Sequence, residues 1–79
     1  MKARITVTLK NSVLDPQGEA ITGALKSLDF KGIHSIRQGK VFDIDLDDMP
    51  VEAAKQKLEQ MCKALLANPV IENYMIEII

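Results

Sequence analysis

The sequence has little of what many functional sites are built from. Its 79 residues include one cysteine, one histidine and no tryptophan, and aromatic residues make up 4%. A single cysteine excludes an internal disulfide and is consistent with a reducing compartment. Without a C-x-x-C motif, a metal-chaperone site would lack its thiolate ligands. So few aromatic rings offer little surface on which nucleic-acid bases could stack.

Charge and hydropathy exclude two further classes of partner. The net charge is −1, whereas a broad nucleic-acid footprint requires clustered lysine and arginine. No hydrophobic stretch approaches the length of a membrane span, and no continuous apolar run follows the first residues as it would in a signal peptide. We therefore expect a cytoplasmic protein that binds neither nucleic acid nor membrane.

The length is that of one domain, residues 1–79, and residues 3–47 contain four periodic segments. Residues 3–10 alternate apolar and polar side chains, which predicts a half-buried strand. Residues 17–29 carry apolar side chains at helical spacing. Residues 33–38 and 41–47 flank Gln38-Gly39-Lys40, and the glycine in so short a connection predicts a hairpin.

The second half predicts one helix and one strand. Asp47, Asp48 and Pro50 favour a helix start, and Pro69 ends the helix because the residue before a proline avoids the helical region. The predicted buried stripe of this helix comprises Val51, Ala54, Leu58, Met61, Cys62 and Leu65. Residues 70–78 are predicted to form the last strand, with inward side chains Val70, Tyr74, Ile76 and Ile78.

The order β-α-β-β-α-β predicts an α+β fold of the ferredoxin-like, split-βαβ type. Two helices would cover one face of a four-stranded antiparallel sheet, and right-handed crossovers give the strand order 4-1-3-2. The first strand then lies between the third and the fourth. Its Arg4 and Lys10 would share the outer face with the acidic side chains Asp43, Asp45, Asp47 and Glu77.

The residues that could carry chemistry favour structural interpretations. His34 has no partners that would make a catalytic triad, and Cys62 lies on an apolar helix stripe, where a buried, unreactive thiol is expected. The aspartates of residues 43–48 alternate along a strand and lack the glycine and terminal glutamate of an EF-hand loop. We therefore expect no catalytic residue and no metal site in this chain.

The turn at residues 14–18, Leu-Asp-Pro-Gln-Gly, is the most distinctive local pattern. Asp15 is suited to cap the following helix, and Pro16 fits the first helical position. Gly18 weakens a helix, which indicates that another backbone or a partner approaches closely. Lys31, Arg37 and Lys40 could contact an anion or an acidic partner, or could form ordinary solvated surface.

Three stretches resemble the PurS family, the small subunit of phosphoribosylformylglycinamidine synthase. They are VTLKNSVLDPQGEAI at 7–21, IRQGKVFDIDL at 36–46 and MCKALLANPVIENYMIEI at 61–78. They cover more than half of the chain in the family's order and spacing. The combination of Leu-Asp-Pro-Gln-Gly with Leu-Ala-Asn-Pro-Val-Ile-Glu at 66–72 is highly specific.

The resemblance implies a role in de novo purine biosynthesis. The enzyme is an ATP-dependent ligase and glutamine amidotransferase complex, which converts formylglycinamide ribonucleotide, glutamine and ATP into formylglycinamidine ribonucleotide, glutamate, ADP and phosphate. In this family a PurQ-type glutaminase releases ammonia, and a PurL-type synthetase uses ammonia, ATP and Mg²⁺. The small subunit carries no cofactor and no catalytic group, and it bridges the other two to support ammonia transfer.

Under this interpretation the turn and its surroundings would dock partners. The candidate docking residues are Lys10, Asp15, Pro16, Gln17, Gly18, Arg37, Lys40, Asn68 and Pro69. Self-association as a homodimer is expected too, because the last strand, Tyr74-Met75-Ile76-Glu77-Ile78-Ile79, is apolar on both faces and would leave a bare sheet edge. Two alternatives stay open: an ACT-like regulatory module that binds an amino acid at a subunit interface near Gln17-Gly18, and a generic protein-interaction domain.

Overall fold

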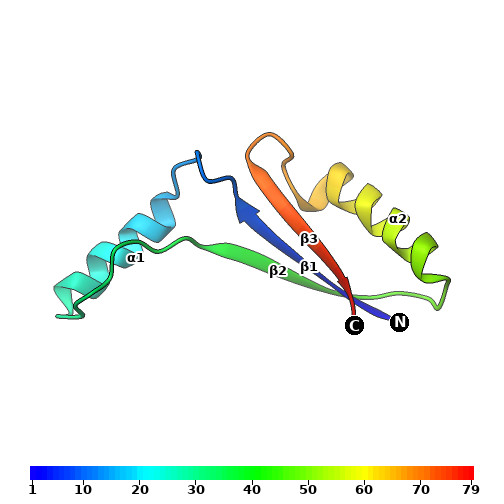
Figure 1. Cartoon of the computed structure of the whole chain (residues 1–79), viewed down its shortest axis with the longest axis horizontal. Coiled ribbons are helices and arrows are strands. Elements are labelled where there is room, and N and C mark those ends of the chain that lie inside the picture. Colours follow the sequence, from blue (N-terminus) through cyan, green and yellow to red (C-terminus); the bar gives the residue numbers. More distant parts are fainter.

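The computed structural model describes residues 1–79, which form a three-stranded antiparallel sheet and two helices (Figure 1). The elements follow in the order β1 (Lys2–Leu9), α1 (Pro16–Ser27), β2 (Gly39–Asp45), α2 (Val51–Met61) and β3 (Glu72–Ile78). The predicted α+β class is confirmed. The strand order is β2-β1-β3, so the first strand lies at the centre, as predicted. Neither helix is both long and apolar enough to span a membrane.

The charge pairing predicted for the outer face of the sheet is confirmed at its centre. Arg4 lies opposite Asp43 of β2 and Glu77 of β3. Its Nε donates to Asp43 Oδ1 over 2.8 Å, and this pair is exposed to solvent. Lys10 and Asp47 lie just beyond the ends of β1 and β2, outside the paired part of the sheet.

The core lies between the inner face of β1 and the inward stripe of α2. Ile5 and Leu58 are fully buried, and the cluster also contains Ala3, Val7, Cys62 and Ala67. Every second side chain of β1 points to the same face of the sheet, and residues three or four apart share one face of α2. These two apolar faces pack against each other to form the core. Phe42, Ile44, Tyr74, Ile76 and Ile78 pack against its edges and are half-buried.

Three side chains that the sequence predicted to face inward are exposed. Val51 is 47%, Leu65 83% and Val70 77% exposed. After α2 the chain continues as one π-helical turn, Cys62–Leu66, closed by the Ala67 N–H that donates to the Cys62 carbonyl. This wider turn rotates Leu65 away from the stripe that regular α-helical spacing would continue. Val70 lies in the turn before β3 and not in the strand.

The predicted second strand, residues 33–38, is not a strand, so the sheet has three strands and not four. This segment runs beside α1 as extended chain and continues into β2 (Figure 1). Gly39 makes no hairpin turn, because it already lies in β2 opposite Thr8. The chain reverses earlier, where Asp29 and Gly32 have φ values of 66° and 81°.

Helix α1 does not cover the sheet, contrary to the predicted arrangement of two helices on one face. It projects from one end of the sheet, far from α2 (Figure 1). The molecule measures 49 × 24 × 15 Å, and its radius of gyration is 16.1 Å, against about 12 Å expected for a compact chain of this length. We call residues 11–38 the arm, and residues 1–10 with 39–79 the body.

Candidate functional site

The junction of arm and body is organised by the carboxylate of Asp15. One oxygen accepts the N–H of Gly18 over 2.9 Å, and the other accepts the N–H of Gln38 over 2.6 Å. Asp15 therefore caps α1, as predicted, and also fastens the helix to the segment that leads into β2. The side chain is buried, and the N–H donors of Gln38 and Gly18, with Arg37 nearby, lower the pKa of its carboxyl group.

The neighbours of Asp15 strengthen the same attachment. Pro16 begins α1, and Gln17 Oε1 accepts a hydrogen bond from Gln38 Nε2 over 2.6 Å. Gly18 is buried, and a Cβ atom on it would collide with the carbonyl oxygen of Ile36. The sequence left open whether a backbone or a partner requires this glycine. The structure shows that the backbone of the same chain does.

The remaining candidate residues lie around this junction. Arg37 donates to the Lys10 carbonyl over 2.9 Å, and the Lys10 N–H donates to the Ile71 carbonyl over 2.9 Å. Lys40 of β2 and Glu72 of β3 lie on the two strands that flank β1, and Lys40 Nζ is 3.6 Å from Glu72 Oε2.

The other oxygen of Glu72 accepts the N–H of Asn68 over 2.7 Å, directly before Pro69. The nine candidate docking residues thus gather at the end of the sheet from which the arm projects. Whether partners dock there stays a prediction.

Sequence reasoning missed two residues that hold this region together. Gln38 was assigned to a hairpin turn, yet it donates both to Asp15 and to Gln17. Glu72 connects Lys40 with Asn68 across the end of the sheet. Gly18, two residues after Pro16 in the first turn of the helix, was the available signal for close backbone packing. Nothing in the sequence indicated which segment packs against it.

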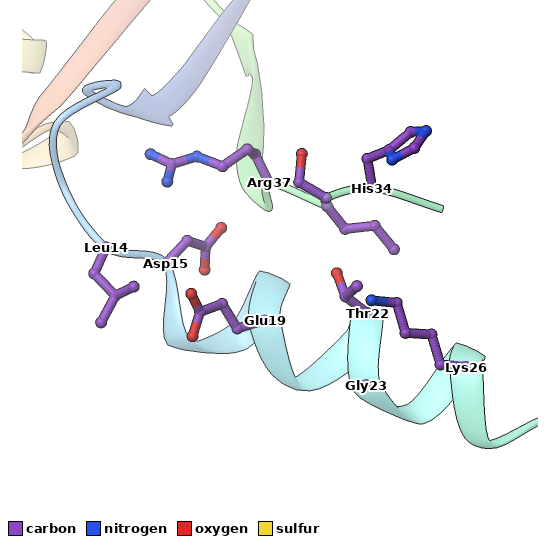
Figure 2. Close-up of a pocket in the computed structure, with 10 residues that line it drawn as sticks. Leu14, Asp15, Glu19, Thr22, Gly23, Lys26, His34 and Arg37 are labelled. Atoms are coloured by element: carbon purple, nitrogen blue, oxygen red, sulfur yellow. The ribbon is translucent and has the colours of Figure 1, made fainter. Parts of the chain in front are cut away.

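Two open grooves flank the junction. The first, of about 410 Å³, lies between α1 and residues 34–37; Figure 2 shows carboxylates at one end and Lys26 and His34 toward the other. The second, of about 340 Å³, lies in the angle between arm and body, with Val7 and Leu9 among its lining. Both are open and lined by charged and polar side chains, which suits contact with a protein surface better than enclosure of a cofactor.

Two titratable groups sit away from the junction, in the body. Cys62 is fully buried, as predicted, and burial raises the pKa of its thiol. A thiol held in its protonated form is a poor nucleophile. Tyr74 donates to Glu59 Oε2 over 2.6 Å, which raises the pKa of Tyr74 to about 12 and ties β3 to α2.

Comparison with known proteins assigns the family. The family model described as "PurS: Phosphoribosylformylglycinamidine (FGAM) synthase" matches residues 2–79. The chain belongs to the PurS family. PurS is a subunit of FGAM synthase, a ligase complex of purine biosynthesis, so the resemblance seen in the sequence is confirmed.

Sequence relatives and solved structures agree with this assignment. The FGAM synthase subunit PurS of Synechocystis sp. is 47% identical over 75 residues, 95% of this chain and 75% of that protein. The crystal structure of Methanocaldococcus jannaschii PurS is 41% identical, with a TM-score of 0.87 over 96% of this chain and 92% of that one. A chain in the structure of PurLQS from Thermotoga maritima is 30% identical, with a TM-score of 0.86 over 96% and 93%.

Proposed function

We propose that this chain is the accessory PurS subunit that holds a PurL-type synthetase and a PurQ-type glutaminase together in the cytoplasm. The observation that carries this proposal is the match, over nearly the whole fold, to a chain of the Thermotoga maritima PurLQS structure. In this assignment ATP and Mg²⁺ are bound by the synthetase, glutamine is hydrolysed by the glutaminase, and this chain supports transfer of the ammonia.

The distribution of polar groups supports a docking role over a catalytic one. The one thiol is buried, and its raised pKa disfavours the thiolate. The candidate docking residues instead direct their donors and acceptors to one another, which fixes the shape of the junction. A rigid surface lowers the cost of association, because fewer side chains need to be immobilised on binding.

Exposed apolar side chains support self-association as a homodimer. Leu28 and Phe30 of the arm are 68% and 56% exposed, and Met75 on the outer face of β3 is 57% exposed. The sheet also ends in two edges, β2 and β3, whose outward backbone groups have no strand beside them. An edge of this kind is normally covered or blunted.

Reconstitution with the two partner subunits tests the assignment. We expect this chain, added to synthetase and glutaminase, to raise glutamine-dependent synthesis strongly and ammonia-dependent synthesis little, because only the former requires transfer between subunits. The chain alone should hydrolyse neither glutamine nor ATP. Equal glutamine-dependent rates with and without the chain would refute the bridging role.

A thermal-shift measurement separates this assignment from the regulatory alternative. Free amino acids at millimolar concentration should leave the melting temperature unchanged, whereas the two partner subunits should raise it. A clear shift with a free amino acid would favour an ACT-like module, for which the groove lined by Asp15, Pro16 and Gln17 is the available site.

A further inference from the structure

Strand β3 lies at an edge of the sheet, and its outward backbone groups have no partner. The N–H of Ile79 donates to the carbonyl of Lys2, and this pair continues the register of β1 and β3. Hydrogen-bonded pairs recur at every second residue of an antiparallel ladder. The residues between them, Tyr74, Ile76 and Ile78, therefore direct their N–H and C=O groups away from β1, toward the open edge.

The edge of β3 lacks the features that keep a sheet edge unpaired. Lysine, proline and β-bulges commonly blunt such edges. The strand Glu72–Ile78 contains no lysine and no proline, and all seven of its residues pair with β1 in an unbroken register. Strand β3 therefore offers a regular template on which another strand can form.

A groove follows this edge beside helix α2. Its volume is about 380 Å³, and it is lined by Lys55 and Glu59 of α2 and by Tyr74, Met75 and Ile76 of β3. Met75 and Ile76 point to opposite faces of the sheet, so the groove lies at the edge itself and not on one face. The backbone of α2 lies closer to β3 than to the other strands (Figure 1). A strand added to β3 would lie in this groove.

Lys55 carries the charge in this groove that has no partner. Glu59 accepts the hydroxyl of Tyr74 over 2.6 Å, whereas Lys55 is exposed and forms no ion pair. A side chain that enters the groove from an added strand would meet Lys55 and the apolar surface of Ile76. An acidic residue among apolar ones in the incoming strand therefore matches this groove, because the acid is attracted to Lys55.

We propose that the edge of β3 receives an extended segment of one of the two partner subunits, which adds a strand to the sheet. Main-chain hydrogen bonds to Tyr74, Ile76 and Ile78 supply the affinity, and an acidic side chain beside Lys55 supplies the selectivity. The inference rests on the accessory role proposed above and specifies one of its docking sites.

A second copy of this chain fits the edge of β3 less well than a segment without a helix. Antiparallel pairing of two β3 strands about a two-fold axis would place both α2 helices on the same face of the joined sheet. Neighbouring strands are only about 4.8 Å apart, whereas packed helices keep their axes about 8–10 Å apart. Because α2 lies closest to the edge strand, little room remains there for a second helix.

Amide hydrogen exchange, resolved by residue, tests how the partner docks. In this chain alone the amides of Met75 and Glu77, which face β1, should exchange slowly, and those of Ile76 and Ile78 should exchange fast. Saturation with the synthetase and with the glutaminase, each in turn, should slow Ile76 and Ile78 at least about tenfold with one of them. This alternation disappears because a strand on the open edge protects the outward amides, which docking on a sheet face would not do.

Charge reversal tests the chemistry of the incoming strand. Lys55→Glu should weaken binding of that subunit roughly tenfold, because repulsion replaces attraction in the groove. Lys57→Glu is the matched control, since it lies exposed on the same helix, changes the net charge equally and does not line the groove. Its affinity should stay within about twofold of the wild type. Circular dichroism and melting temperatures confirm that both variants are folded.

Three results would overturn this docking mode. Fast exchange of Ile76 and Ile78 with either subunit bound would show that the edge stays open in the assembly. Slow exchange that develops without a partner, as the concentration of this chain rises, would show that a second copy occupies the edge. Equal weakening by Lys55→Glu and Lys57→Glu would show that no acidic contact forms in the groove. Each result is separate from the bridging role, which glutamine-dependent synthesis in the reconstituted complex still measures.

Discussion

The side chain of Asp15 has two structural roles that usually need separate residues: it caps the start of α1, and it holds a distant segment of the chain against that helix. Changing Asp15 to Asn separates them, since asparagine still caps a helix but presents an amide where Gln38 donates. We expect Asp15→Ala to lower the melting temperature by about 4–8 °C at neutral pH. Asp15→Asn should show a smaller decrease that arises from the lost bond to Gln38. Equal melting of Asp15→Asn and the wild type would show that this bond contributes nothing.

The same carboxyl group predicts an acid dependence. Hydrogen bonds from Gln38 and Gly18 lower the folded-state pKa of Asp15. Its stabilisation is therefore present above the unfolded pKa, about 3.9, and is lost as the pH falls through the folded value. In acid titrations followed by circular dichroism, the stability difference between wild type and Asp15→Asn should shrink below about pH 4. A difference that stays constant as the pH falls further would contradict this.

Tyr74 predicts a dependence at the alkaline end. Its hydrogen bond to Glu59 raises its pKa to about 12. Stabilisation by a group with a raised pKa is complete below the unfolded value, about 10, and is lost as the pH rises through the folded value. Wild type should lose stability between about pH 10 and 12, and Tyr74→Phe should lose less over that interval. Denaturant midpoints at neutral pH and within that interval would measure the difference.

At the scale of elements, α1 contains a matched pair of glycines. Gly23 is exposed, and a Cβ atom added to it would meet nothing within 4 Å, whereas a Cβ atom on Gly18 would meet the Ile36 carbonyl. Gly23→Ala should stabilise the helix by about 0.5–1 kcal/mol. Gly18→Ala should destabilise it by about 1–3 kcal/mol through the backbone collision. Denaturant unfolding of both variants checks the signs, and a stabilised Gly18→Ala would mean that α1 and residues 36–38 separate easily.

The fold of the body could be predicted because its hydrophobic periodicity and its cross-strand charge pairs are local patterns that indicate the same arrangement. The spacing of apolar residues such as Ile5, Val7 and Leu58 leaves each element only one face that can be buried. Arg4 lies opposite acidic residues on both neighbouring strands. The caps at Asp15 and Pro16 were predictable for the same reason.

The arm was not predictable, because the short pattern of residues 33–38 does not distinguish a strand of the sheet from extended chain that packs beside a helix. The contact that holds this segment beside α1 is the hydrogen bond from Gln38 to Asp15, two residues that lie 23 positions apart in the sequence. The gathering of Lys10, Arg37 and Asn68 at one end of the sheet likewise depended on the tertiary path and not on any spacing.

At the scale of the whole molecule, the small core predicts that stability depends on concentration. Only nine of the 79 residues are buried, and a core of this size leaves a single chain marginal. If folding and association are coupled, the melting temperature should rise steadily with protein concentration. Calorimetry between about 5 and 500 μM, compared with light scattering over the same range, measures both. A melting temperature independent of concentration would indicate a chain that folds without its partner.

The position of β1 at the centre of the sheet also determines how long this strand lacks its packing partners during synthesis. β1 is synthesised before both of its neighbours, and β3 emerges about 60–70 residues later, which takes roughly 3–14 s at usual elongation rates. During that interval Ile5 and Val7 cannot be fully enclosed, because the elements that pack against them, α2 and β3, are not both synthesised. The nascent chain therefore leaves an apolar strand without its packing partners, and chaperone binding during translation is expected to concentrate on residues 2–9.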